Sequence, residues 1–147
     1  MIYYIIKHVH SGLRWILVSA ILIILFNSVS ALLKEKKYST IHKKILSSAF
    51  GLYHLQIIFG LILYLISPKV NFSSAAFSNP VQRFFLIEHI TGMILSLFIF
   101  WIGFSRIKKL KTDQQKFQAQ LIYIGISFLI LLATIPWPFF GYGSMWI

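Results

Sequence analysis

The sequence predicts an all-α integral membrane protein whose four spans form an up-down-up-down four-helix bundle. Of its 147 residues, 58% are hydrophobic and 17% aromatic, which is more than soluble domains usually contain. Four apolar segments each approach the ~20 residues needed to cross a bilayer. The connections between them are short, so consecutive helices are expected to be antiparallel neighbours. We expect a single transmembrane domain, residues 1–147, with spans at about 13–33, 45–66, 82–106 and 117–135.

The first segment also has features of a signal peptide. Lys7 and Arg14 precede an apolar core over residues 15–26, and the small residues 29–31 follow it. Its length suits a full membrane span better than the shorter apolar core of a signal peptide. We therefore expect a retained transmembrane helix, preceded by an amphipathic stretch at residues 3–12.

Local signals indicate where the later helices begin and end. Ser78 or Asn79 before Pro80 is a helix start, with a capping side chain followed by proline in the first turn. Pro136 is expected to stop the last helix. The tail at residues 139–147 is rich in aromatic residues and glycine, which suits the headgroup region of a bilayer.

The distribution of basic residues predicts the orientation in the membrane. The net charge is +11, and the basic residues cluster between the apolar segments, which favours anionic lipid over nucleic acid as the partner. By the positive-inside rule, we expect both termini outside and a multi-pass protein of the bacterial inner (cytoplasmic) membrane. The expected cytoplasmic side carries Lys34, Lys36, Lys37, Lys43, Lys44, Arg106, Lys108, Lys109, Lys111 and Lys116, against Lys7, Arg14, Lys69 and Arg83 outside.

The residues that are missing exclude several kinds of chemistry. The chain has no cysteine, which excludes disulfides, thiolate zinc sites, iron–sulfur clusters and covalently attached haem. It has three acidic residues, and no carboxylate pair, nucleophile motif or phosphate-binding loop is present. An electron-transfer protein is therefore expected rather than a stand-alone enzyme, with any haem or metal held by His, Met or oxygen ligands.

Two histidines within the apolar spans predict a haem site. Ionisable groups in a span are costly and are kept mainly for function. His54 shares a helical stripe with Ser47 and Gly51, and His89 shares one with Gly92 and Ser96. The small residues leave room beside each imidazole. We expect haem b between His54 and His89, with the macrocycle filling that room.

His10 with His89 is the rival pair of haem ligands, because these helices would be diagonal in the bundle. Arg14 lies one turn from His10 and needs an anion at that depth. Arg14 or Arg83 could meet haem propionates. Glu88 and His89 point about 100° apart, so they need different partners. We expect Glu88 to face Arg14.

Four motifs occur along the chain: His8-Val9-His10-Ser11-Gly12-Leu13-Arg14-Trp15, the run from His54 to Tyr64, Arg83-Phe84-Phe85-Leu86-Ile87-Glu88-His89 and Ile135-Pro136-Trp137-Pro138-Phe139. They resemble a family of small bacterial four-helix membrane proteins described as cytochrome b-like. The resemblance covers nearly the whole chain and implies haem b and one-electron transfer. A quinol that docks in the outer half is our candidate electron donor. At the level of the fold, the chain is also similar to the haem-anchoring membrane subunits of succinate dehydrogenase.

Two other functions compete with a cytochrome. The chain could be a non-catalytic accessory subunit of a larger membrane complex, since it is small and has no soluble domain. It could be a metal-binding or transport protein that uses His10, His54 and Glu88 as ligands. Arg14 and Glu88 could also form only a buried pair that fixes the helix register.

Overall fold

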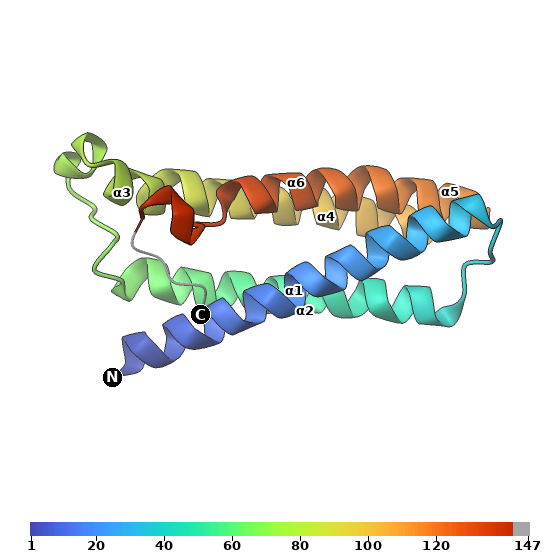
Figure 1. Ribbon diagram of the computed structural model, residues 1–147, viewed down its shortest axis with the longest axis horizontal. Coiled ribbons are helices and arrows are strands. Elements are labelled where there is room, and N and C mark those ends of the chain that lie inside the picture. The colour runs from blue at the N-terminus through green and yellow to red at the C-terminus, as the bar shows by residue number, and fades with distance from the viewer. Residues whose placement is uncertain (143–147) are drawn as a thin grey trace.

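The computed structural model describes residues 1–142, and it confirms the all-α four-helix antiparallel bundle (Figure 1). Each of the four rods is long and apolar enough to cross a membrane. The third and fourth rods each contain one π-helical turn. The elements are α1 Ile2–Leu33; α2 Thr40–Ile66; α3 Pro80–Arg83, a π turn Phe84–Glu88 and α4 His89–Lys109; and α5 Asp113–Ala119, a π turn Gln120–Ile124 and α6 Gly125–Thr134, with short 3₁₀ turns at Ser74–Ser78 and Pro138–Phe140.

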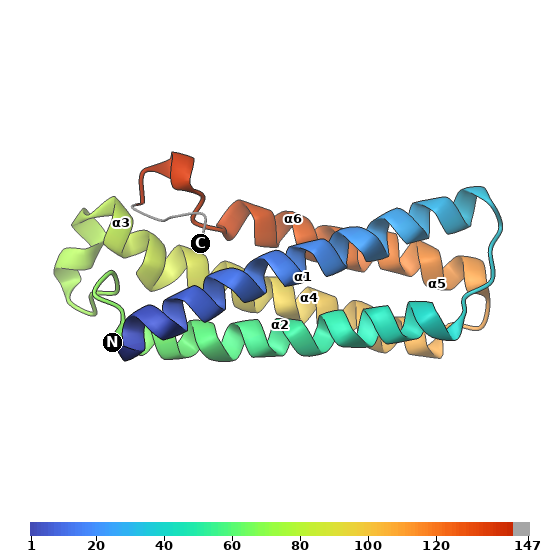
Figure 2. The same cartoon turned by 60° about the horizontal axis from the view of Figure 1, so that its bottom comes forward.

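The helices form a four-cornered bundle in which α1 and α4 occupy opposite corners. α1 packs on α2 and on the rod from α5 to α6, while α4 packs on α2 and on that same last rod. In both Figure 1 and Figure 2, the N-terminal half of α1 runs beside α2 and diverges from α6. The bundle is therefore widest at the end that holds the N-terminus and the connection between α2 and α3.

Capping side chains define several helix ends. The Asn79 side chain accepts hydrogen bonds from the backbone N–H groups of Val81 and Gln82, and Pro80 occupies the first position, as predicted. The Nδ1 atom of His42 accepts the backbone N–H of Ser39, 3.0 Å away, at the start of α2. His42 is therefore a capping residue.

The first helix is longer than the predicted span because the amphipathic lead-in continues it without a break. α1 begins at Ile2 and contains 32 residues, so it extends about 48 Å at 1.5 Å per residue. A bilayer core is about 30 Å thick. The helix is therefore long enough to tilt within the bilayer or to project beyond the hydrocarbon. In Figure 1 it runs obliquely to the other helices.

Two layers of buried hydrogen bonds cross the bundle interior. In the middle layer, Tyr53 donates its hydroxyl to Ser96 over 2.6 Å, and the Ser127 hydroxyl donates to the Ser96 carbonyl over 2.8 Å. In the second layer, nearer the basic connections, Gln120 accepts from Ser28 over 2.7 Å and donates to the Tyr38 hydroxyl over 3.0 Å. Such pairs contribute about 0.6 kcal/mol on average between membrane helices and fix which faces meet.

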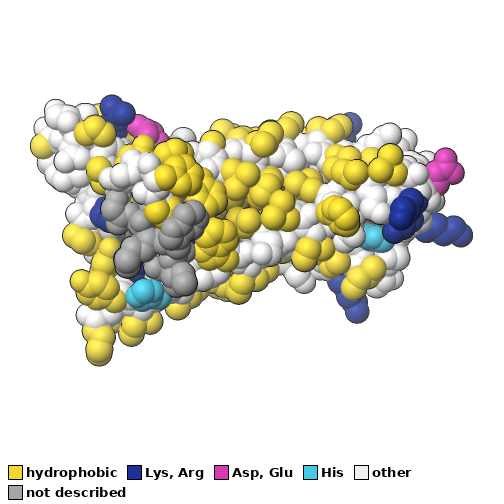
Figure 3. Space-filling view, in the orientation of Figure 1, with side chains coloured by type: hydrophobic (Ala, Val, Ile, Leu, Met, Phe, Trp, Pro, Cys, Tyr) yellow, Lys and Arg dark blue, Asp and Glu magenta, His cyan; other side chains and the backbone are white. Residues whose placement is uncertain are grey.

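The outer surface has the pattern of a membrane protein. Apolar side chains cover the middle of the face shown in Figure 3, and basic side chains gather toward its ends. Phe26, Leu65, Phe98 and Leu129 are among the exposed large hydrophobic residues. The chain is therefore a multi-pass membrane protein by fold and surface. Of the predicted aromatic tail, residues 143–147 lie outside the described residues.

Candidate functional site

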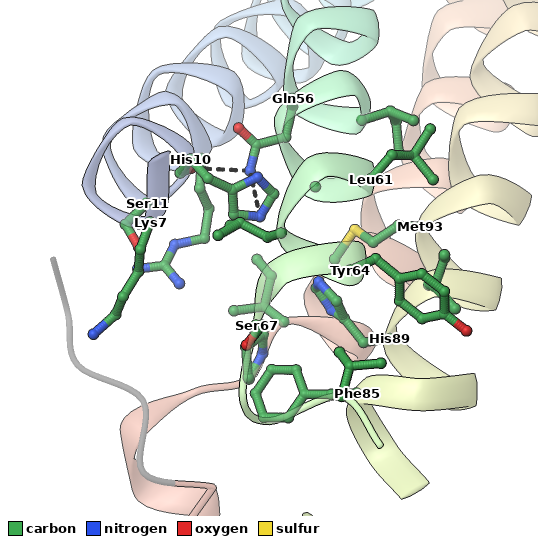
Figure 4. Close-up of a pocket in the computed structure, with 18 of the residues that line it drawn as sticks. Lys7, His10, Ser11, Gln56, Leu61, Tyr64, Ser67, Phe85, His89 and Met93 are labelled. Atoms are coloured by element: carbon green, nitrogen blue, oxygen red, sulfur yellow. Dashed lines mark hydrogen bonds between the residues drawn. The ribbon is translucent and has the colours of Figure 1, made fainter. Parts of the chain in front are cut away.

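A cavity of about 140 Å³ lies inside the wide end of the bundle. It has about ten times the space that one water molecule needs. Residues from α1, α2, α4 and the end of α6 line it, so it belongs to the bundle as a whole. Figure 4 shows the rings of His10 and His89 in this cavity, carried by different helices. The rival pair of the sequence prediction is therefore brought to one cavity.

His89 is held in a defined tautomer and orientation. Its Nδ1 lies 2.7 Å from the backbone carbonyl oxygen of Thr134, at the C-terminal end of α6. A carbonyl oxygen can only accept, so Nδ1 carries the proton and Nε2 keeps its lone pair. Histidines that ligate metals commonly donate their other ring nitrogen to a backbone carbonyl in this way. The arrangement suits Nε2 for coordination.

His10 is held against α2 by Gln56. The Gln56 amide nitrogen donates to the His10 carbonyl over 3.0 Å and approaches His10 Nε2 at 3.2 Å. Gly60 makes room for the ring, because a Cβ at that position would lie 3.2 Å from His10 Cε1. Among the described residues, His10 Nδ1 and Gln56 Oε1 are buried without a hydrogen-bond partner. The cavity therefore offers one donor and one acceptor to a ligand.

Basic residues line the outer end of the same cavity. Lys7 and Arg14 come from α1, and Lys69 comes from the connection after α2. Arg14 is buried, with its guanidinium carbon 5.3 Å from the centre of the Trp15 ring. Lys69 donates to the Tyr142 carbonyl over 2.8 Å. The surroundings of the two histidines are strongly cationic.

The structure does not bring His54 into this cavity. Its ring is exposed on the outer face of α2, where Nδ1 donates to the Phe50 carbonyl over 2.8 Å. Ser47 and Gly51, the small residues of its stripe, are exposed as well. The face of α2 that packs inward is instead the one with Ala49, Tyr53 and Gln56. The preferred pair of His54 and His89 is therefore corrected: these two side chains do not face each other.

Glu88 and Arg83 also lie away from the cavity. They pair with each other, with Arg83 Nε 2.9 Å from Glu88 Oε1, and both side chains are nearly half exposed. The pairing of Glu88 with Arg14 was therefore wrong. The cause is the π turn at Phe84–Glu88, which places residues five apart on one face and brings Glu88 back over Arg83.

The small residues on α4 do face inward, but protein atoms fill the room beside them. A Cβ at Gly92 would collide with Thr134 Cγ2. Ser96 is fully buried between Tyr53 and Ser127. The expectation that a macrocycle fills these positions is corrected. Instead, Gly92 lets α6 approach α4 closely enough for Thr134 to reach His89.

Several residues of the site were missed by sequence reasoning. Gln56, Thr134, Lys7 and Lys69 hold the histidines or line the cavity. The pattern Ala49, Tyr53, Gln56 at helical spacing marks the buried face of α2 and could have found Gln56. Nothing in the sequence marks the carbonyl of Thr134, because a helix end offers that group whatever its side chain is.

Comparison with known protein families, curated proteins and solved structures finds no match for this chain. The fold and the surface define a multi-pass membrane protein with a histidine-lined, cationic cavity at one end of the bundle. Among residues 1–142, no three His, Asp or Glu side chains gather closely enough to hold a metal ion.

Proposed function

We propose that this chain is a b-type cytochrome-like membrane protein that binds one haem b in the cavity and transfers single electrons. The observation that carries the proposal is the hydrogen bond from His89 Nδ1 to the Thr134 carbonyl. It leaves an unprotonated Nε2 on a ring that lines a cavity between four helices. This is the tautomer that an axial histidine needs, held by the kind of carbonyl partner that orients such ligands.

His10 is the second ligand in this proposal, from the opposite corner of the bundle. Its Nε2 accepts a hydrogen bond from the Gln56 amide. His10 can therefore ligate the iron only when Nε2 gives up this hydrogen bond. Apolar side chains, among them Leu61, Met93 and Leu131, line part of the site. When bound, haem supplies reversible one-electron chemistry. The residues of the chain hold the group, orient it and lower the polarity around it.

The proposed setting is the inner membrane of a bacterium, with the N-terminus outside. Ten lysines and arginines lie on or beside the connections 34–39 and 110–112, and four lie toward the other end. This asymmetry supports a cytoplasmic position for the two basic connections. The histidine cavity then opens in the outer half of the bilayer. A quinol in the lipid is the proposed electron donor, and subunits of a larger membrane complex are proposed neighbours.

An optical spectrum of the protein purified from haem-replete cells tests the proposal. The expected result is a reduced-minus-oxidised spectrum of b type. His89→Ala should abolish it, and His10→Ala should change the iron's coordination while part of the haem is retained. His54→Ala is the matched control, because it removes an exposed imidazole from the neighbouring helix face. Its spectrum should match that of the unaltered protein.

A colourless preparation would overturn the proposal, as would a spectrum that is lost in His54→Ala and kept in His89→Ala. If the colourless protein co-purifies in fixed proportion with other membrane proteins, the accessory-subunit function replaces it.

A further inference from the structure

One side of the cavity is lined by cationic side chains and another side by apolar ones. At the outer end, Lys7, Arg14 and Lys69 converge from two segments of the chain. On the side between α2 and α4, Leu61, Met93 and Ile94 line the same space. A ligand that satisfies both sides has an anionic part and an apolar part.

The apolar side of the cavity reaches the lipid-facing surface. Leu61 and Ile94 line the cavity, yet their side chains are 44% and 50% exposed. Above them, the Tyr64 hydroxyl donates to the Leu86 carbonyl over 3.0 Å and ties α2 to the π turn. A ligand's apolar body can therefore extend sideways between α2 and α4, under this hydrogen bond.

We infer that the outer end of the cavity is an anion-binding subsite formed by Lys7, Arg14 and Lys69, and that the ligand's apolar body points toward the opening between α2 and α4. The ligand is an amphiphile with carboxylate or phosphate oxygens. This inference rests on the proposed function for one of its two sources, because the propionates of haem supply carboxylates. The phosphate of an anionic phospholipid is the other source with the same chemistry.

The electrostatics of Lys69 support an anion at this place. Burial, and then the charge of Lys7, lower the pKa of Lys69. Two ammonium groups that disfavour each other in a partly buried space are stabilised when an anion lies between them.

A double-mutant design with a chemically altered ligand tests the subsite. The variant Lys7→Gln/Lys69→Gln removes two positive charges from the cavity lining. Haem and haem dimethyl ester, whose carboxylates are neutral, are titrated into the haem-free protein in detergent. The variant should bind haem about tenfold more weakly, which corresponds to 1.4 kcal/mol. Esterification should weaken binding to the unaltered protein by a similar factor, and binding to the variant hardly at all.

Two matched variants accompany this titration. Lys36→Gln/Lys37→Gln removes the same charge from the connection at the other end of the bundle, and its haem affinity should not change. Lys7→Arg/Lys69→Arg keeps the charge and should restore most of the affinity. If each variant loses as much affinity for haem dimethyl ester as for haem, the inference of a carboxylate-binding subsite is overturned.

A second arm keeps the inference testable if the chain binds no haem. The protein is placed in nanodiscs of mixed phosphatidylglycerol and phosphatidylcholine, released into mild detergent and examined by native mass spectrometry. Retention of phosphatidylglycerol that is lost in Lys7→Gln/Lys69→Gln supports the subsite with a lipid phosphate as its anion, even though the proposed function has failed. Equal retention of both lipids by both proteins overturns the subsite itself.

Discussion

His89 on α4 donates its Nδ1 proton to the backbone carbonyl of Thr134, 2.7 Å away at the C-terminal end of α6. The last carbonyls of a helix have no partner inside the helix. The bond therefore does two things at once: it closes the end of α6, and it fixes the tautomer of the imidazole. Removal of His89 should affect both the stability of the apoprotein and ligand binding, and a suitable substitution can separate the two.

His89→Asn is that substitution. The asparagine amide can donate to Thr134 from nearly the position of Nδ1, but it offers no nitrogen lone pair for coordination. We expect His89→Asn to lose the haem spectrum while the apoprotein keeps its thermal stability. His89→Ala should lose both, with a stability loss of about 1–2 kcal/mol for an unsatisfied helix end. Equal melting temperatures for the two apoproteins would show that the bond to Thr134 contributes nothing.

Gly92→Ala tests the close approach of α4 and α6. Its new Cβ would collide with Thr134 Cγ2, so the two helices must separate. We expect a loss of about 1–3 kcal/mol of stability from overpacking, together with weaker haem binding as Thr134 moves away from His89. Gly51→Ala is the control, because nothing lies within 4 Å of its Cβ and the helix gains a better helix former. Thermal unfolding in detergent compares the two.

Gly60→Ala acts on the other wall of the cavity. The added Cβ would approach His10 Cε1 to 3.2 Å, so the ring must shift by a few tenths of an ångström. The α2 helix itself should be slightly more stable, because alanine favours helix more than glycine does. We therefore expect an altered haem spectrum at unchanged or raised thermal stability. An unaltered spectrum would argue against His10 as a ligand.

Neutralising the Arg83–Glu88 pair should leave the site intact. Both side chains are nearly half exposed and neither lines the cavity. Exposed ion pairs contribute about 0–1 kcal/mol. Glu88→Gln and Arg83→Gln should therefore retain haem and lose little stability. Loss of haem in Glu88→Gln would restore the role that the sequence had suggested for this carboxylate.

Anion binding at the outer end should weaken as the pH rises. Burial and the charge of Lys7 lower the pKa of Lys69, so the free protein loses this charge at a lower pH than an unperturbed lysine would. A bound anion favours the charged form. The affinity for an anionic lipid or for haem carboxylates should fall as the pH passes upward through the lowered pKa. His10, His89 and Arg14 also face the cavity, and their titration could contribute to this pH dependence. The affinity of Lys69→Gln, measured over the same pH range, identifies the share of the pH dependence that is due to Lys69.

The sequence predicted the four membrane spans more accurately than it predicted which side of each helix packs inward. Composition and length identified four spans, and Asn79 with Pro80 marked a helix start that the structure confirms. Helix faces are harder to assign, because a membrane helix is apolar on both its lipid side and its packed side. On α2 the small residues beside His54 face outward, whereas the polar pair of Tyr53 and Gln56 faces inward. Polar residues at helical spacing were the better guide to the interior.

The π turns explain the remaining differences. A π turn adds one residue to a helical turn without any characteristic composition, so regular 3.6-residue spacing gives the wrong partner beyond it. Glu88, the last residue of its π turn, pairs with Arg83 for this reason. The second π turn contains Gln120, whose amide joins Ser28 and Tyr38. Both interruptions lie where a polar contact forms.

The hydrogen-bonded layer of Tyr53, Ser96 and Ser127 lies across the bundle at the inner end of the cavity. Tyr53 lies one turn inward from Gln56 on α2, and all three residues of the layer are fully buried. Beneath it, Ile21, Phe100 and Ile124 are also closed off from solvent. In the described part of the protein, the cavity is therefore confined to one end of the bundle, and side chains fill the interior next to it. A ligand of the cavity is therefore expected to enter and leave at the wide end of the bundle or through the opening between α2 and α4.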